Sequence, residues 1–527
     1  MRKILTSIGF IFFTTPSILF HGCTNFQHSK NLSINMRDDP RSLDPRQVRL
    51  LSDMNLTRHI YEGLIQENTS TGHSEPALAE SFSLSNDGKT YTFNLRQAHW
   101  SNGDPITSED FIASWKQVIS NEILSVYSFA FNPIKNVEKI QKGLTSLDSV
   151  GFYAKNDKTL VIELESPTSH FLKLLALPVF FPIHKNQRQS PSMIPIASSA
   201  FYPKQIKEKQ WLKLEKNPYY YNQEQVDIET ITIHFIADPN TASLLFNQGK
   251  IDWQGPPWGD RIPIETLSYL QTQGSLCSFD VAGTSWLIFN VNKSPLNHPK
   301  LREALSLALD KEKFVSTVFL GRKRCVEHIL PDNLHTYPDT NNSTLEERNR
   351  KAKRLFRESL EELNISAKDL DGLPLILTPI SSANALFAQM IREQWKDILG
   401  FTISITIKEF ALLQSDLFSG DFSLAICCWY ADFFDPMAFL TIFDRPTGIQ
   451  PYMLDREDFT LLITTIHKET DLEKRKQLVS QAALYLENLR IVEPLYYDIF
   501  YFTLNENISN ISYFPTGNVD FRYAKVS

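Results

Sequence analysis

Apolar and polar residues alternate along two short neighbouring stretches, which predicts a β-hairpin. The first stretch is Ser81 to Ser85 and the second is Thr90 to Leu95, with Asn86-Asp87-Gly88 as a turn between them. A helix is expected after Thr107, because this threonine can cap it and Asp110 follows at the capping-box position three residues on. This part of the chain is therefore expected to hold a small sheet and then a helix.

The rest of the chain switches between the periods of strands and helices. A strand at 230–236, a helix at 239–247 and a strand at 250–253 predict a β-α-β unit, and a second unit is predicted across 373–407. Other strands are expected at 32–36, 150–153, 159–164, 287–290 and 492–497, and other helices at 53–61, 301–308, 346–360 and 471–487. The pattern predicts an α/β protein with two lobes and a smaller mixed region.

Length and composition agree with a large globular protein. A chain of 527 residues is too long for one ordinary core, so two or three domains are expected. The 36 Phe, 18 Tyr and 8 Trp residues are expected mainly in cores, with a minority lining a cleft. The net charge of −7 argues against nucleic acid as a partner.

Residues 1–22 have the pattern of an export signal. Arg2 and Lys3 precede an apolar stretch, 4–20, that is short for a membrane-spanning helix. The stretch ends in Phe20-His21-Gly22-Cys23, which resembles a bacterial lipoprotein cleavage site, so Cys23 is the expected lipidation site. The mature protein is expected in the periplasm, held at a membrane surface through that anchor.

The remaining cysteines and the other reactive residues do not predict catalysis. Cys277, Cys325, Cys427 and Cys428 show no disulfide or metal spacing and are expected to be buried free thiols. Cys427 and Cys428 would point to opposite faces of a strand. The common hydrolase, metalloprotease, dinucleotide and P-loop motifs are absent, so no catalytic residue, metal or cofactor is expected.

The order of residues between Pro76 and Phe111 resembles the signature of the peptide/nickel class of extracytoplasmic solute-binding proteins, family 5, whose best-known member serves bacterial oligopeptide permeases. The signature reads P-x-L-A-x-S, then D-G-x-x-Y-T-F-x-L-R, then W-S-x-G-x-P-x-T-x-x-D-F, and it is matched at Pro76–Ser81, Asp87–Arg96 and Trp100–Phe111. Further matching blocks are Ser42–Pro45, Tyr61–Leu64, Lys216–Tyr220 and the segment beginning at Leu301.

The resemblance implies a two-lobed periplasmic-binding-protein fold (type II, cluster C) with an extra mixed α+β domain inserted in lobe I. Crossings between the lobes would form a hinge, and closure would trap ligand between them. The implied division is 24–61, 186–282 and 495–527 for lobe I, 62–185 for the extra domain, and 283–494 for lobe II.

The resemblance also implies a binding site. Asp432 follows an apolar strand, where α/β folds present ligand-binding groups. By the family's pattern it would hold a peptide's ammonium group, and Trp429 would wall the first side-chain pocket. Taken alone, Asp432 could instead cap the next helix. The further candidates are the strand residues Cys428 and Tyr430, the pre-helix segment from Arg49 to Leu51, and the aromatic residues Phe410 and Trp286, of which Phe410 could equally be a core residue.

Several positions depart from the family's pattern. The oligopeptide binder has a disulfide where this chain has Gly283 and Tyr430. Its basic residues for the peptide's C-terminus fall at or near Leu417 and Ile426, and an acid before the first helix is replaced by Arg49. The amine end of a peptide is therefore expected to be recognised, while length and C-terminal preference stay open.

The sequence thus predicts a monomeric binding protein that captures short peptides and delivers them to the transmembrane and ATPase subunits of an ABC permease. Main-chain pairing with an extended ligand would let one cleft accept many sequences. The alternatives are a relative that binds a nickel chelate, haem or oligosaccharide, an envelope lipoprotein without a transport role, and an exported hydrolase.

Overall fold

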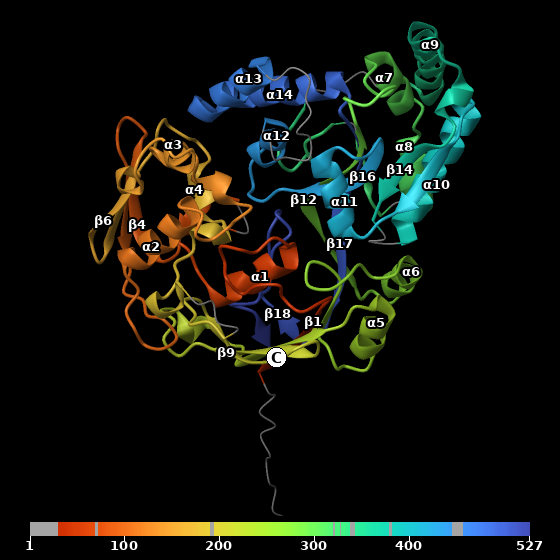
Figure 1. Ribbon diagram of the computed structural model, residues 1–527. Coiled ribbons are helices and arrows are strands. Elements are labelled where there is room, and N and C mark those ends of the chain that lie inside the picture. The colour runs from red at the N-terminus through yellow and green to blue at the C-terminus, as the bar shows by residue number, and fades with distance from the viewer. Residues whose placement is uncertain are drawn as a thin grey trace, which may run out of the picture.

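The computed structural model describes residues 30–68, 72–189, 194–319, 322–326, 328–337, 343–378, 382–444 and 457–527. The export segment and Cys23 lie outside the described residues. Figure 1 shows two lobes, one above the other, with an extra domain beside them. The expected two-lobed α/β architecture is confirmed, and none of the described helices is long and apolar enough to span a lipid bilayer.

Lobe I is built on a four-stranded sheet in the order β1-β10-β9-β8. β1 pairs in parallel with β10, and the other pairs are antiparallel. The strands are β1 (Asn31–Met36), β8 (Phe201–Lys207), β9 (Trp211–Lys216) and β10 (Thr230–Phe235), and the helices beside them are α1 (Leu51–Ile60), α5 (Pro239–Asn247) and α6 (Ile264–Thr272).

The β-α-β unit predicted at 230–253 is wrong in its last strand. Asp252 donates its main-chain N–H to Ser33 O at 2.6 Å, so the chain passes beside β1. The next two residues, β11 (Trp253–Gln254), then pair antiparallel with β17 in a different sheet. This segment contacts β1 at Ser33, through Lys250 O and Asp252, and its next residues pair with β17 instead.

A seven-stranded sheet runs through both lobes in the order β11-β17-β12-β16-β14-β15, with β13 added on β17. β12 (Leu276–Phe289) and β17 (Val492–Leu504) pair antiparallel along most of their length and link the lobes (Figure 1). The predicted strands at 287–290 and 492–497 are therefore too short, because polar residues such as Asp280 and Asp498 interrupt the apolar pattern.

The pairing of β12 with β17 is broken twice. The register shifts between Asp280 and Thr284, opposite Asp498, and again between Ser285 and Trp286, opposite Leu495. The first break on β12 includes the expected boundary at 282/283, and the second break on β17, at Leu495, lies at the boundary expected at 494/495. The residue bounds of the domains stay a prediction.

Lobe II contains the rest of this sheet and most of the long helices. The unit predicted at 373–407 is confirmed, since β14 (Leu373–Leu377), α10 (Ser382–Leu399) and β15 (Ile403–Ile407) follow in order and the strands pair in parallel. The other elements are α7 (Pro299–Leu307), α8 (Lys311–Val318), β13 (Arg324–Cys325), α9 (Leu345–Leu363), α11 (Phe410–Ser419), β16 (Leu424–Tyr430), α12 (Met437–Asp444), α13 (Glu457–Lys468) and α14 (Leu472–Leu489).

The extra domain contains the predicted hairpin and capped helix. β4 (Ala79–Leu84) and β5 (Thr90–Leu95) pair within the sheet β4-β5-β7-β6. Thr107 donates its main-chain N–H to Asp110 Oδ2 at 3.0 Å, which forms the expected capping box. The remaining elements here are β2 (Ile65–Glu67), β3 (Ser74–Pro76), α2 (Ser108–Ile119), α3 (Val137–Gln141), β6 (Phe152–Asn156), β7 (Thr159–Glu163) and α4 (Phe171–Leu175).

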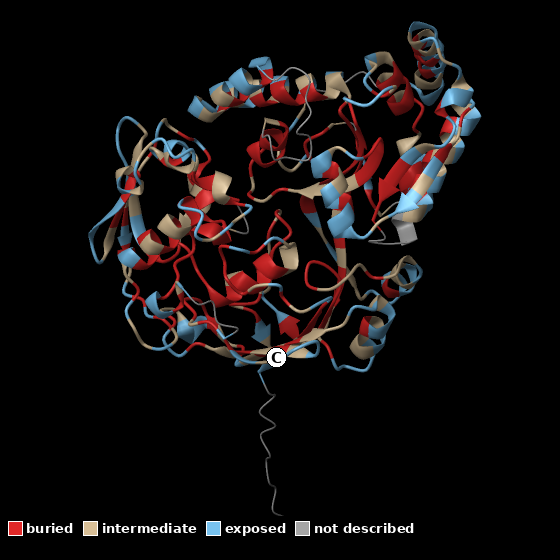
Figure 2. Ribbon diagram, viewed as in Figure 1, coloured by how far each residue is buried: buried red, intermediate tan, exposed pale blue. Residues whose placement is uncertain are grey.

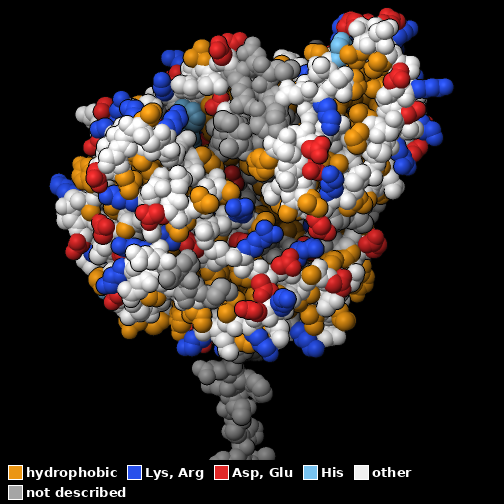
Figure 3. Space-filling view, viewed as in Figure 1, with side chains coloured by type: hydrophobic (Ala, Val, Ile, Leu, Met, Phe, Trp, Pro, Cys, Tyr) orange, Lys and Arg blue, Asp and Glu red, His pale blue; other side chains and the backbone are white. Residues whose placement is uncertain are grey.

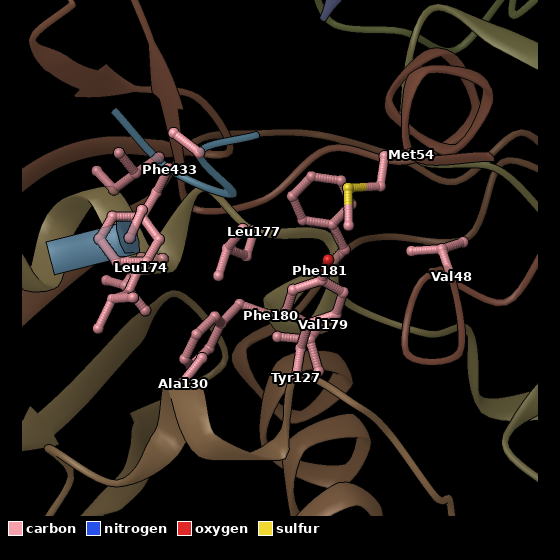
Figure 4. Packing of buried hydrophobic residues seen from close by; sticks show 14 of the residues in the cluster. Val48, Met54, Tyr127, Ala130, Leu174, Leu177, Val179, Phe180, Phe181 and Phe433 are labelled. Atoms are coloured by element: carbon pink, nitrogen blue, oxygen red, sulfur yellow. The ribbon is translucent and has the colours of Figure 1, made fainter. Parts of the chain in front are cut away.

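Buried residues run through all three parts (Figure 2), and many of them are apolar. One cluster reaches from lobe I through the extra domain into the α12 region of lobe II, and a second fills lobe II between α7, α10 and the sheet. Figure 4 shows a stretch of the first cluster, where Phe433 of lobe II lies beside Leu174 of the extra domain, and Phe181 beside Met54 of lobe I. The three parts are thus in contact around one shared core.

Candidate functional site

One edge of β16 has no described neighbouring strand beside the predicted site residues Cys428 and Tyr430. In an antiparallel pair, alternate residues exchange hydrogen bonds with the partner strand. Ala431 N–H bonds Ala282 O at 2.8 Å, so the main-chain groups of Trp429 face β12 and those of Cys428 and Tyr430 face the other way. On that other side β14 pairs only with Leu424 and Ala425. Beyond Ala425, no described strand occupies this edge.

Asp432 lies where β16 ends and meets the extra domain. Its carboxylate is half-buried, and Tyr127 Oη donates to Asp432 Oδ1 at 2.9 Å. Tyr127 belongs to the extra domain and faces its shared core (Figure 4). The bond therefore joins lobe II to the extra domain at the carboxylate.

The loop after Asp432 is bound by lobe II on one side and by the extra domain on the other. Asp435 is buried and pairs with Arg475 of α14 at 2.7 Å and with Lys173 of α4 at 3.6 Å. Lys173 Nζ also donates to Phe434 O at 2.5 Å. Arg475 and the neighbouring cations lower the pKa of Asp435 to about 2 despite its burial. The carboxylate is therefore ionised, and its negative charge is balanced by these cations.

Trp429 lies over α12, on the opposite face of β16 from the Tyr430 side chain. Its indole N–H donates to Ala438 O at 3.0 Å, and the ring is half-buried. Phe410 begins α11 and is 37% exposed. Arg49 is exposed, and the half-buried Leu51 begins α1.

Trp286 does not face a cleft, so its selection as a ligand-facing residue is wrong. The alternation along β12 turns this ring toward α12, where it packs against Phe439 and Phe443 at centroid distances of 5.8 and 5.7 Å. Its exposed fraction is 0%. Trp286 is a core residue.

The cysteines are exposed to different degrees. Cys277, Cys427 and Cys428 are half-buried thiols, and burial raises the pKa of Cys427 to about 12. Such a thiol stays protonated and unreactive at neutral pH. The expectation of burial is wrong for Cys325, because β13 is a short strand whose residues face solvent.

Gly283 and Tyr430 are direct cross-strand partners. These are the two positions where the oligopeptide binder has its disulfide. A Cβ atom on Gly283 would lie 2.5 Å from Tyr430 Cδ1, so the aromatic ring covers the glycine. The ring contact fills the space beside the glycine, and a side chain at position 283 would displace it.

The hydroxyl of Tyr430 enters a buried cluster of charges at the first register break. Asp498, 1% exposed, accepts hydrogen bonds from Tyr430 Oη, from Lys323 Nζ and from both terminal nitrogens of Arg261. Arg261 also donates to Tyr430 Oη at 2.8 Å. Arg261 lies in lobe I, between β11 and α6, whereas Lys323 precedes β13 in lobe II. The two cations hold the pKa of Asp498 well below its usual range, against the effect of burial.

The sequence did not predict the hydrogen-bond partner of Asp432 or the ion-pair partners of Asp498. Tyr127 lies in the turn just before a short 3-10 helix, Ser128–Phe131, and belongs to no recognisable motif. Asp498 did carry a signal, since it is an acid inside the otherwise apolar strand Tyr496–Phe502 and an unpaired buried charge is costly. A buried cationic partner could have been expected there, although the sequence does not say which residue.

The face drawn in Figure 3 is hollowed near its middle, between the lobes, with hydrophobic side chains in the hollow. Within the described residues, no group of three or more His, Cys, Asp or Glu side chains could hold a metal ion. The site therefore offers an open strand edge, a carboxylate at its end and aromatic walls.

Comparison with known proteins agrees with this geometry. Residues 73–451 match the model of "Bacterial extracellular solute-binding proteins, family 5 Middle". The chain belongs to this family.

Curated members of family 5 resemble the chain over most of their length. The oligopeptide-binding protein OppA of Bacillus subtilis is 31% identical over 505 residues, covering 94% of this chain and 92% of that protein. The dipeptide-binding protein DppE of the same organism is 26% identical over 510 residues, with the same coverage. The crystal structure of Haemophilus influenzae OppA with the peptide RPPGFSPFR has a TM-score of 0.81 at 20% identity, covering 95% of this chain and 99% of that one.

We expect Asp498→Asn to destabilise this family 5 protein by about 3–5 kcal/mol, because it leaves the buried Lys323 and the half-buried Arg261 without their counter-charge. Urea unfolding at pH 7 measures the change. The folded-state pKa is depressed, so the carboxylate stabilises the fold above the unfolded pKa of about 3.9 and loses that effect as the pH falls toward the folded value. Asp280→Asn, at an exposed pair with Arg324, is the control and should change little.

We expect Trp286→Ala to lower the free energy of unfolding by about 3–5 kcal/mol, because it empties a fully buried site against Phe439 and Phe443. Phe410→Ala, at a partly exposed position, should cost far less. Equal losses in thermal or urea unfolding of the two variants would contradict the assignment of Trp286 to the core.

Proposed function

We propose that this protein captures short peptides between its two lobes and delivers them to the transmembrane and ATPase subunits of an ABC permease. The observation that carries the proposal is the open edge of β16, which presents the main-chain groups of Cys428 and Tyr430 and ends at Asp432. An extended peptide can add to such an edge as a further strand, which binds what all peptides share. The names of the curated relatives OppA and DppE support the same ligand class.

In this proposal Asp432 holds the peptide's ammonium group. The carboxylate follows directly on the edge strand, and the bond from Tyr127 shows that the extra domain reaches the same point. Trp429 and Phe410 would line side-chain pockets, and Arg49 to Leu51 would contact the peptide from lobe I. Leu417 and Ile426 are both buried in the core, so neither offers a charge to the peptide's C-terminus.

The proposed setting is the outside of the cell membrane. Residues 1–22 would direct export, and a lipid on Cys23 would keep the monomeric protein near its permease. Closure of the lobes around the peptide is the working step, and no covalent bond changes.

We expect Asp432→Ala to lower peptide affinity about 30-fold or more. Losing a desolvated, charge-assisted contact costs roughly 2–5 kcal/mol, and each 1.4 kcal/mol is tenfold in affinity. Titration calorimetry with trialanine measures the change, and Asp421→Ala, at an exposed turn of the same lobe, is the matched control. Unchanged affinity in folded Asp432→Ala would remove this residue from the site.

The proposed function is tested by native mass spectrometry of gently purified protein. We expect a mixture of bound peptides of a few residues each, with small-angle scattering showing a more compact particle when peptide is added to stripped protein. A bound metal chelate, haem or sugar would replace the peptide proposal. Hydrolysis of the added peptides would contradict a pure binding role.

A further inference from the structure

Lobe II meets the extra domain at the loop after β16. Residues 433–435 follow directly on Asp432, the proposed contact for a peptide's ammonium group, and we call them the clasp loop. Phe433 is stacked on the ring of His170 of the extra domain, with a centroid distance of 5.7 Å, and lies beside Leu174 (Figure 4). The clasp loop is therefore packed against the extra domain next to the proposed ligand contact.

Lys173 of α4 makes polar contacts between the extra domain and the clasp loop. Its ammonium nitrogen donates to Phe434 O at 2.5 Å and lies 3.6 Å from Asp435 Oδ2. The same nitrogen lies 5.7 Å from the centre of the Phe434 ring, a distance at which the face of a ring attracts a cation. One side chain thus binds the main chain, a carboxylate and an aromatic ring of the clasp loop.

The ion pair between Lys173 and Asp435 can break without leaving either charge unpaired. Asp435 keeps Arg475 of its own lobe, which lies at 2.7 Å, and a hydrogen bond at 3.0 Å from the N–H of Met437. Lys173 keeps Glu67 of the extra domain, which is close enough for the two charges to interact, and its side chain is 30% exposed. A buried charge left alone is costly, so this arrangement suits a contact that forms and breaks repeatedly.

The contact of Lys173 with the clasp loop lies across the expected hinge between the lobes. The extra domain is bound to lobe I, since Arg46 donates to Gln117 at 2.7 Å and Ala197 N–H donates to Ser101 Oγ at 2.9 Å. Lobe II is joined to lobe I through the long strands β12 and β17. When the lobes separate about these strands, we expect the extra domain to stay with lobe I, so that Lys173 leaves the clasp loop.

We propose that Lys173 is a positioning residue that fastens the clasp loop, and with it Asp432, to the extra domain once a peptide lies between the lobes. This inference rests on the proposed function and adds to it a device that slows peptide release. Lys173 binds the chain two and three residues past Asp432, so it holds the carboxylate in place through the main chain. Because peptide enters while the lobes are apart, the clasp lowers the dissociation rate and leaves the association rate unchanged.

The test measures the two rate constants separately, by rapid filtration of the full mature protein with radiolabelled trialanine. We expect Lys173→Met to raise the dissociation rate about tenfold, which is the effect of losing one charge-assisted hydrogen bond. The association rate should stay within about twofold of that of the unsubstituted protein. Lys173→Arg, which keeps the charge and the donors, should restore slow release.

The matched control is Lys135→Met, which removes an exposed ion pair with Glu163 inside the extra domain and should change neither rate. Urea unfolding of the peptide-free protein separates a purely structural role, because its midpoint should be the same in Lys173→Met as in the unsubstituted protein. Lys173→Gln is the second variant in case methionine disturbs folding, and it should release trialanine equally fast.

Unchanged dissociation in folded Lys173→Met or Lys173→Gln overturns the clasp. A change confined to the association rate, or fast release that Lys173→Arg shares, overturns it too. In each of these cases trialanine still binds the unsubstituted protein, and the proposed function stands. If trialanine binds neither the unsubstituted protein nor any variant, the clasp and the proposed function both fail.

Discussion

The carboxylate of Asp498 is the constraint on which the arrangement of the two lobes depends. β12 and β17 are the strands that run through both lobes, and Asp498 lies where their register breaks. A buried carboxylate is tolerated only when it is paired, and its partners come from three places: Arg261 of lobe I, Lys323 of lobe II and Tyr430 at the end of β16. One charge therefore fixes the crossover, the relative position of the lobes, and the end of the open edge together.

Tyr430 links this charge cluster to the binding edge. Its ring occupies the space above Gly283, its hydroxyl meets Asp498, and its main-chain groups face the open side of β16. At this pair of positions, where the family resemblance pointed to a disulfide in the oligopeptide binder, this chain has an aromatic ring over a glycine and a hydrogen bond from that ring to Asp498. The same carboxylate pairs with Arg261 of lobe I and Lys323 of lobe II, so the end of the open edge and the contact between the lobes share one residue.

The elements best predicted from the sequence were those with local signals. The Thr107 capping box, the hairpin turn at Asn86–Gly88 and the unit from β14 to β15 all follow from spacing within a few residues. The lengths of β12 and β17 were underestimated, because the acids that interrupt the apolar pattern are neutralised by residues more than a hundred positions away. Trp286 was misjudged for a related reason: alternation tells which residues share a face, but only tertiary packing shows that α12 covers that face.

Three aspartates, Asp432, Asp435 and Asp498, illustrate why residue type alone does not assign a role. Asp498 and Asp435 are both nearly fully buried, and each is already neutralised by two cations, so neither has charge to offer a further one. Asp432 differs from them in being half-buried and in receiving a neutral hydroxyl from the extra domain. A charged ligand group can approach a half-buried carboxylate, whereas a fully buried carboxylate is closed to it. The position of Asp432 at the end of an open strand edge is why we propose this residue, and not Asp435 or Asp498, as the contact for a charged ligand group.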